Sequence, residues 1–124
     1  MSRIVKTDKV PKAIGPYSQA VVCGNVVYTS GQIAINPETG NIDAKTIEAQ
    51  TEQVCKNIKA LLTASGSGID NVVKTTCFLK NMEDFAAFNA VYGSYFVSKP
   101  ARSCVAAKQL PKDVLVEVEV IAAF

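Results

Sequence analysis

The segment from Val114 to Ile121 reads Val-Leu-Val-Glu-Val-Glu-Val-Ile. Successive side chains of a β-strand point to opposite faces, so this alternation predicts a strand with its valines on one face. The other face carries Leu115, Ile121, Glu117 and Glu119. We expect the valine face to lie beneath helices. The second face is too apolar for plain solvent exposure, and we expect it to pack against other copies of the chain.

Four further strands are predicted around this one. Residues 20–23 and 26–29 are apolar segments that flank Gly24-Asn25, a two-residue loop typical of a tight β-hairpin. Residues 72–79 are rich in β-branched and apolar side chains and are expected to form a strand that is mostly buried on both sides. Residues 101–107 are expected to form a short strand after Lys99-Pro100.

Two helices complete the pattern. Between about Thr46 and Ala64, apolar residues recur at helical spacing, and the helix is expected to end near Ser65-Gly66 because glycine adopts a left-handed C-terminal cap at little cost. A second helix is expected to begin with Asn81 as its cap and to end at Lys99-Pro100. Its aromatic residues fall near one stripe, which favours core packing: Phe85, Phe88, Tyr92, Tyr95 and Phe96.

The order of these elements is typical of an α+β fold in which two helices pack on one face of a mixed sheet. The 124 residues, 48% of them hydrophobic, are enough for one core. We therefore expect a single domain over residues 1–124. Because so small a domain offers little room for an internal cavity, a catalytic pocket is more easily built between subunits.

Composition excludes several functions. The formal charge is +2 and the basic residues are scattered, so a nucleic-acid groove is not expected. The N-terminus shows no signal peptide and no stretch reaches membrane-spanning length, which favours the cytoplasm.

Histidine is absent, so catalysis must use carboxylate, Arg, Tyr, Ser, Thr, Cys or backbone groups. No metal site or disulfide framework is expected from the four widely spaced cysteines, Cys23, Cys55, Cys77 and Cys104.

The two glutamates of the alternating strand could share general acid and base chemistry, since they lie about 6 to 7 Å apart by strand geometry. The alternative, that both are solvated or ion-paired, is favoured by spacing alone. Glu117 is the stronger candidate because its neighbours on that face are apolar, and a carboxylate in such surroundings needs a partner or a function.

Arg102 and Cys104 lie in the short strand after Pro100. The planar guanidinium of Arg102 could bind a carboxylate through two hydrogen bonds, although a solvated surface arginine is the commoner case. Cys104 has no histidine to activate it, so a small apolar residue of the core or of a pocket wall is favoured over a nucleophile. At Ser30-Gly31, the glycine would allow a backbone N–H to approach a ligand closely.

These pieces together resemble the Rid/YjgF family of reactive-intermediate deaminases. The resemblance spans nearly the whole chain, in order and with matching spacing. Its motifs are Gly15-Pro16-Tyr17-Ser18-Gln19-Ala20, Thr29-Ser30-Gly31-Gln32, Val73-Lys74-Thr75-Thr76, the helix from Phe85 to Tyr95, Pro100-Ala101-Arg102-Ser103-Cys104-Val105, Leu110-Pro111-Lys112 and Glu117-Val118-Glu119.

The resemblance implies a chorismate-mutase-like fold that forms a homotrimer, with the sheets inward as a central barrel and three clefts between subunits. It implies that Arg102 holds the carboxylate of a 2-imino acid and that Glu117 activates water. Tyr17, Ser30, Gly31 and Cys104 would line the cleft. The implied reaction is hydrolysis of 2-iminobutanoate or 2-iminopropanoate, released by pyridoxal-dependent dehydratases, to a 2-keto acid and ammonia, without cofactor or metal.

Two alternatives stay open at this point. Some relatives are called single-stranded-RNA endoribonucleases that inhibit translation, although the near-neutral charge and the missing histidine disfavour that activity. A non-catalytic trimer could instead use the same clefts to bind small carboxylates or to act as a chaperone. The sequence does not separate this binding protein from the deaminase.

Overall fold

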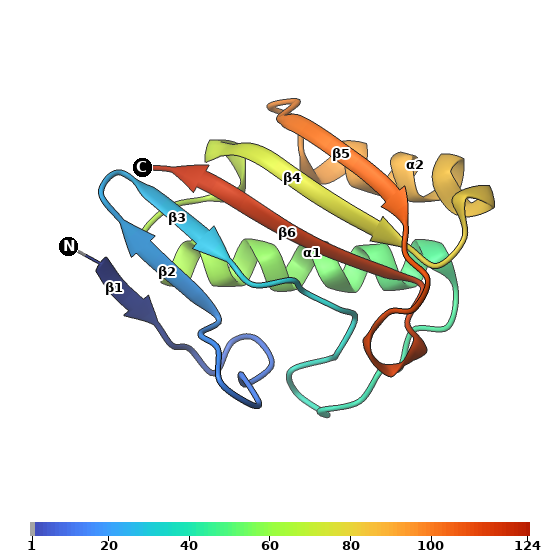
Figure 1. Ribbon diagram of the computed structural model, residues 1–124, viewed down its shortest axis with the longest axis horizontal. Helices are drawn as coiled ribbons and strands as arrows, with labels where there is room; N and C mark the ends of the chain where they lie inside the picture. Colours follow the sequence, from blue (N-terminus) through green and yellow to red (C-terminus); the bar gives the residue numbers. More distant parts are fainter. Residues whose placement is uncertain (1) are drawn as a thin grey trace.

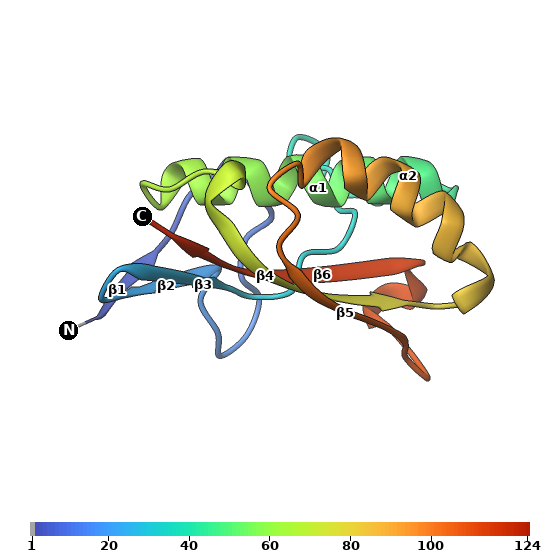
Figure 2. The same cartoon turned by 90° about the horizontal axis from the view of Figure 1, so that it is seen from above.

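The computed structural model describes residues 2–124, which form one six-stranded mixed sheet with two helices packed on one of its faces (Figures 1 and 2). The strand order is β1-β2-β3-β6-β4-β5. The α+β prediction is confirmed. The strands are β1 (Ser2–Val5), β2 (Ala20–Cys23), β3 (Val26–Thr29), β4 (Val72–Leu79), β5 (Ala101–Ala106) and β6 (Val116–Ala123), and the helices are α1 (Ile47–Ala64) and α2 (Phe85–Tyr95).

The strand β6 lies near the middle of the sheet, where it pairs antiparallel with both β3 and β4. Its valines alternate as the sequence predicts: Val116, Val118 and Val120 are buried beneath the helices. The only parallel pair in the sheet described here is β4 with β5, and α2 makes the crossover between them, as parallel neighbours require. This topology places β5 at an edge of the sheet.

The predicted hairpin is confirmed. β2 and β3 are antiparallel with Cys23 opposite Val26, and Gly24 takes a φ of 60° in the turn. The first helix is also as predicted. The Thr46 side chain accepts a hydrogen bond from the Ala49 amide at its start, and Gly66, with a φ of 90°, follows its end.

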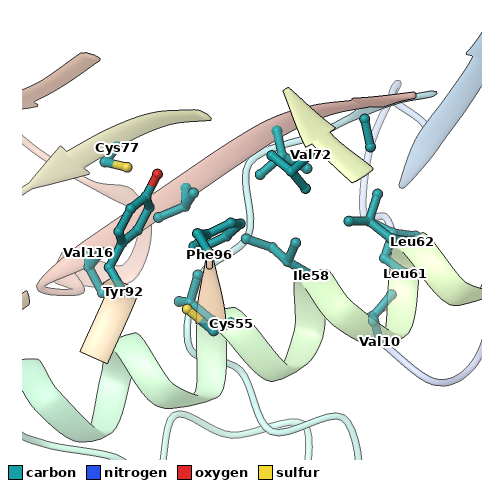
Figure 3. Close-up of a cluster of buried hydrophobic side chains, with 14 of the residues drawn as sticks. Val10, Cys55, Ile58, Leu61, Leu62, Val72, Cys77, Tyr92, Phe96 and Val116 are labelled. Atoms are coloured by element: carbon teal, nitrogen blue, oxygen red, sulfur yellow. The ribbon is translucent and has the colours of Figure 1, made fainter. Parts of the chain in front are cut away.

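The core lies between the sheet and the helices (Figure 3). Val54, Ile58 and Leu61 of α1 are fully buried there. The aromatic stripe of α2 packs into the same layer: the Phe88 and Tyr92 ring centroids lie 5.3 Å apart, and those of Tyr92 and Phe96 lie 4.5 Å apart. Contacts at these separations add to the gain from burial alone, which is about 25 cal/mol per Å² of apolar surface.

Three local predictions are wrong. Asn81 precedes a 3-10 turn, Met82–Asp84, and makes no capping hydrogen bond with its side chain, so α2 begins only at Phe85. The helix ends at Tyr95, four residues before Lys99-Pro100. β4 is buried on one face only, since Val73 is 51% exposed and Phe78 is half-buried.

Both α1 and α2 lie on one side of the sheet, and only loops lie over the other side in the single chain (Figure 2). Tyr28 and Val105, which the register places on that face, are each 48% exposed, and Ile121 is half-buried. Glu117 and Glu119 share this face, which we call the outer face.

Neither helix in the part of the chain described here is long and apolar enough to cross a bilayer.

Candidate functional site

The predicted site residues fall into two groups on the sheet. Tyr17, Ser30, Gly31 and Glu117 lie together, and we call them the Glu117 cluster. Arg102 and Cys104 lie apart from them on the edge strand β5, and with the α2 side chains that contact Arg102 they form the Arg102 cluster.

A short backbone bridge brings Gly31 to Glu117. The Gln32 amide donates to the Val118 carbonyl at 2.8 Å, and the Val118 amide donates to the Gln32 carbonyl at 3.1 Å. The Glu117 carboxyl then lies against Gly31: a β-carbon at position 31 would overlap Oε2 and lie 2.9 Å from Cδ. Any side chain at position 31 would therefore displace the Glu117 carboxyl from this place.

Ser30 and Tyr17 complete this cluster. The Ser30 hydroxyl donates to the Ser18 carbonyl at 2.6 Å, and the Tyr17 hydroxyl accepts a 3.3 Å bond from the Ile14 amide. They border a cavity of about 570 Å³ that Glu117 also lines. The rest of the wall consists of five apolar residues, Pro11, Ile14, Ile33, Ile35 and Pro111, and four polar ones, Lys12, Gln19, Gln32 and Lys112.

Burial raises the pKa of the Glu117 carboxyl, and the nearby Glu119 carboxylate raises it further. A carboxyl with a raised pKa exchanges protons closer to neutral pH than an ordinary glutamate does. This property suits a general acid or base.

The sequence interpretation assigned no role to Gln19, yet this side chain holds the segment that carries Tyr17. It is buried, its Oε1 accepts from the Thr7 amide at 2.8 Å, and its Nε2 donates to the Thr7 and Pro11 carbonyls at 3.0 and 2.8 Å. The sequence gives only a weak signal for this role, because only the fold shows that the glutamine just before β2 faces the N-terminal loop.

Arg102 is held by α2. Its guanidinium carbon lies 5.3 Å from the centre of the Phe85 ring and 4.9 Å from that of Tyr92, distances typical of cation–π contact. Nη1 donates a hydrogen bond to Oδ1 of Asn89 at 2.7 Å. The side chain lines an open hollow of about 650 Å³ beside Tyr92 and Pro100.

Cys104 points to the same side of β5 as Arg102 and lies directly opposite Cys77 of β4. It is half-buried. Burial raises the pKa of the Cys104 thiol, while the Arg102 charge acts in the opposite direction. A raised pKa keeps the sulfur protonated at neutral pH and makes it a poor nucleophile.

The two clusters lie on opposite faces of the sheet. Arg102 is in register with Thr75 and so with the buried Val120, whereas Glu117 is in register with Phe78 on the outer face. The register separates their backbones by three residues and two strand spacings, about 14 Å by strand geometry. One chain therefore cannot present both groups to a ligand of a few atoms.

Asn89 was missed by the sequence interpretation, although a signal existed. It lies four residues after Phe85 and three before Tyr92, so the three side chains share one helical face.

Within residues 2–124, no three acidic or cysteine side chains converge in a way that could hold a metal ion.

Fold and site thus define a small α+β protein that displays a guanidinium and a carboxyl on opposite faces of one sheet. The sequence profile of the family described as Endoribonuclease L-PSP matches residues 7–124. The chain belongs to this family, which is the Rid/YjgF family that the motifs resemble.

Known relatives match over nearly their full length. The 2-iminobutanoate/2-iminopropanoate deaminase of Escherichia coli K12 is 47% identical over 126 residues, covering 98% of each chain. A crystal structure from Thermotoga maritima MSB8 is 54% identical with a TM-score of 0.97, covering 100% of this chain and 98% of that one. Escherichia coli TdcF with bound serine is 41% identical with a TM-score of 0.93, covering 98% of each. Other relatives carry RutC-family or regulator names.

Proposed function

We propose that the protein hydrolyses 2-iminobutanoate and 2-iminopropanoate to 2-keto acids and ammonia. The observation that carries the proposal is that the same chain displays a held guanidinium and a carboxyl of raised pKa. A 2-imino acid offers the complementary groups: a carboxylate for Arg102 to bind and an electrophilic C=N carbon for activated water. The identity to the deaminase of E. coli supports this choice of substrate.

We further propose that two chains form each site. Since Arg102 and Glu117 lie on opposite faces, the Arg102 cluster of one chain would meet the Glu117 cluster of its neighbour. The apolar residues of the outer face would be covered in a homotrimer whose sheets face inward. Closed cyclic assembly repeats the same contact three times and so gives three equivalent clefts.

The chemistry in this cleft needs orientation and one proton-handling group. Arg102 would bind the substrate carboxylate, and Glu117 would accept a proton from water as the oxygen attacks the C=N carbon. Returning that proton to nitrogen would give a carbinolamine. Transfer of the carbinolamine hydroxyl proton to nitrogen, again through Glu117, would then break the C–N bond, release ammonia and form the C=O bond. The reaction balances with water alone. Ser30, Gly31, Tyr17 and Cys104 would shape the cleft around the reacting atoms.

The decisive experiment couples the protein to a threonine dehydratase and measures the release of ammonia and keto acid. Wild type should accelerate release, and Arg102→Ala and Glu117→Ala should each lose about 10²-fold or more. Glu117→Ala should still bind 2-oxobutanoate. Absence of acceleration by folded wild type would reject the deaminase, and retained binding would then favour a non-catalytic carboxylate-binding protein.

Light scattering tests the assembly independently. We expect about three times the chain mass of 13.2 kDa at micromolar concentration. A monomer would remove the shared cleft and with it the proposed mechanism.

An endoribonuclease is the second candidate, because the matching family profile carries that description. The formal charge of +2 gives little attraction to phosphates. Cleavage of single-stranded RNA by wild type, lost in folded Arg102→Ala, would favour it over the deaminase.

A further inference from the structure

The guanidinium of Arg102 is fixed by one face of α2. Phe85, Asn89 and Tyr92 are separated by four and three residues, the spacing that places helical side chains side by side. The two rings contact the cation at 5.3 and 4.9 Å, and the Asn89 amide oxygen accepts from Nη1 at 2.7 Å. Aromatic contacts fix the plane of the guanidinium, and the hydrogen bond fixes its rotation within that plane.

One of the two rings is itself anchored. The Tyr92 and Thr75 hydroxyls form a buried 2.7 Å hydrogen bond, and Thr75 is the direct cross-strand neighbour of Arg102. Tyr92 therefore cannot rotate away from the guanidinium without leaving a buried hydroxyl unpaired, which costs about 1 to 3 kcal/mol. Residues from β4, β5 and α2 together define a single orientation for Arg102.

The group that orients Arg102 carries no charge. Among residues 2–124 no carboxylate forms an ion pair with this arginine, and its side-chain partner is an amide. A carboxylate at the same place would form a charge-assisted pair with the guanidinium and compete with an incoming carboxylate. An amide oxygen occupies one of the five N–H donors and leaves the positive charge uncompensated.

We infer that Asn89 is a positioning residue that holds Arg102 for a ligand carboxylate while preserving its charge for that ligand. The inference rests on the proposed function, in which Arg102 binds the carboxylate of the substrate. It adds a requirement at position 89: the side chain must accept a hydrogen bond and must be neutral.

Two substitutions separate orientation from charge. Asn89→Ala removes the hydrogen bond only, whereas the nearly isosteric Asn89→Asp keeps an acceptor and neutralises the cation. The probe is 2-oxobutanoate, with binding measured by isothermal titration calorimetry. We expect Kd to rise about 3- to 10-fold in Asn89→Ala and about 10- to 100-fold in Asn89→Asp, the ranges that correspond to neutral and charged hydrogen bonds. Asn81→Asp, which adds the same charge at an exposed position outside both clusters, is the matched control and should bind like wild type.

Turnover supplies a second readout. KM should rise in both variants in the same order while kcat changes less, because the carboxylate is bound in the ground state and the transition state alike. Binding by Asn89→Asp within twofold of wild type, with an unchanged melting temperature, would overturn the inference. A greater loss in Asn89→Ala than in Asn89→Asp would also overturn it, since orientation alone would then explain the effect. Wild type that binds 2-oxobutanoate without turnover would reject the deaminase, while the binding order would still test Asn89.

Discussion

The Arg102 cluster and the Glu117 cluster differ in how the structure holds their central side chains. In the proposed mechanism Arg102 must keep a fixed position and a full charge, and in the structure it is held by two rings and a neutral amide. The same mechanism requires an exchangeable proton on Glu117, whose carboxyl lies half-buried against a glycine with its pKa raised. The first cluster is stabilised by a helix packed on β5, and the second by a loop paired to β6. Rigid contacts thus hold the proposed binding group, and desolvation adjusts the pKa of the proposed proton-transfer group.

The sharpest test asks whether the two clusters work in different chains. Arg102→Ala and Glu117→Ala should each lose about 10²-fold or more of kcat/KM. Trimers assembled at random from equal amounts of both variants should recover activity in about a quarter of their clefts, because those clefts combine one intact cluster from each chain. The assay is ammonia release after co-refolding, with each variant refolded alone as the control. A mixture as inactive as its components would contradict the shared cleft.

Gly31 lies against the Glu117 carboxyl, and Gly31→Ala should displace that carboxyl. We expect kcat to fall about 10- to 100-fold, the scale of a misplacement near 1 Å, with little change in the Kd of 2-oxobutanoate. Gly68→Ala is the matched control, because its added carbon meets nothing within 4 Å and its φ is extended. Equal rates in the two variants would show that the close approach to Glu117 does not matter for turnover.

The pH dependence of kcat/KM should respond to changes near Glu117 but not to changes at Arg102. If ionised Glu117 activates water, the rate falls as pH drops through its raised pKa. Because the Glu119 carboxylate contributes to that rise, Glu119→Gln should move this acidic limb to lower pH. Arg102→Lys should reduce the rate without moving the limb. An acidic limb unaffected by Glu119→Gln would argue against Glu117 as the titrating group.

Stability should change in the opposite direction from activity at Glu117. A carboxyl whose pKa is raised in the folded state binds more protons there than in the unfolded chain, so the free energy of unfolding falls as pH rises through that interval. Glu117→Gln should remove this penalty and stabilise the protein at pH 7 by up to about 1 kcal/mol, limited by the half exposure of the side chain. Thermal melting at equal protein concentration measures the effect, and a lower melting temperature would contradict it.

Cys104 should show the smallest effect. Since burial raises the pKa of its thiol, we expect Cys104→Ala to keep kcat within about threefold of wild type. A loss of kcat as large as that of Arg102→Ala would indicate that the Cys104 sulfur takes part in the reaction.

Local patterns predicted most of the fold. The alternation from Val114 to Ile121 identified the buried face of β6, and Gly24-Asn25 identified the hairpin, because side-chain period and turn geometry are properties of short segments. Where packing competes with local preference, the prediction failed. Asn81 is an ordinary helix cap by residue type, yet the chain makes a 3-10 turn there and α2 begins at Phe85.

The sequence by itself determined which chemical groups the protein owns: a guanidinium after Pro100, a carboxyl among apolar neighbours and no imidazole. Only the tertiary structure decided where those groups lie. The register of β4 with β5 and β6 turned Arg102 and Glu117 to opposite faces, the Gln32–Val118 bridge brought Gly31 to Glu117, and α2 placed Asn89 on Arg102. Each of these contacts joins residues distant in the chain, and such pairings follow from packing the whole sheet and its helices rather than from any local pattern.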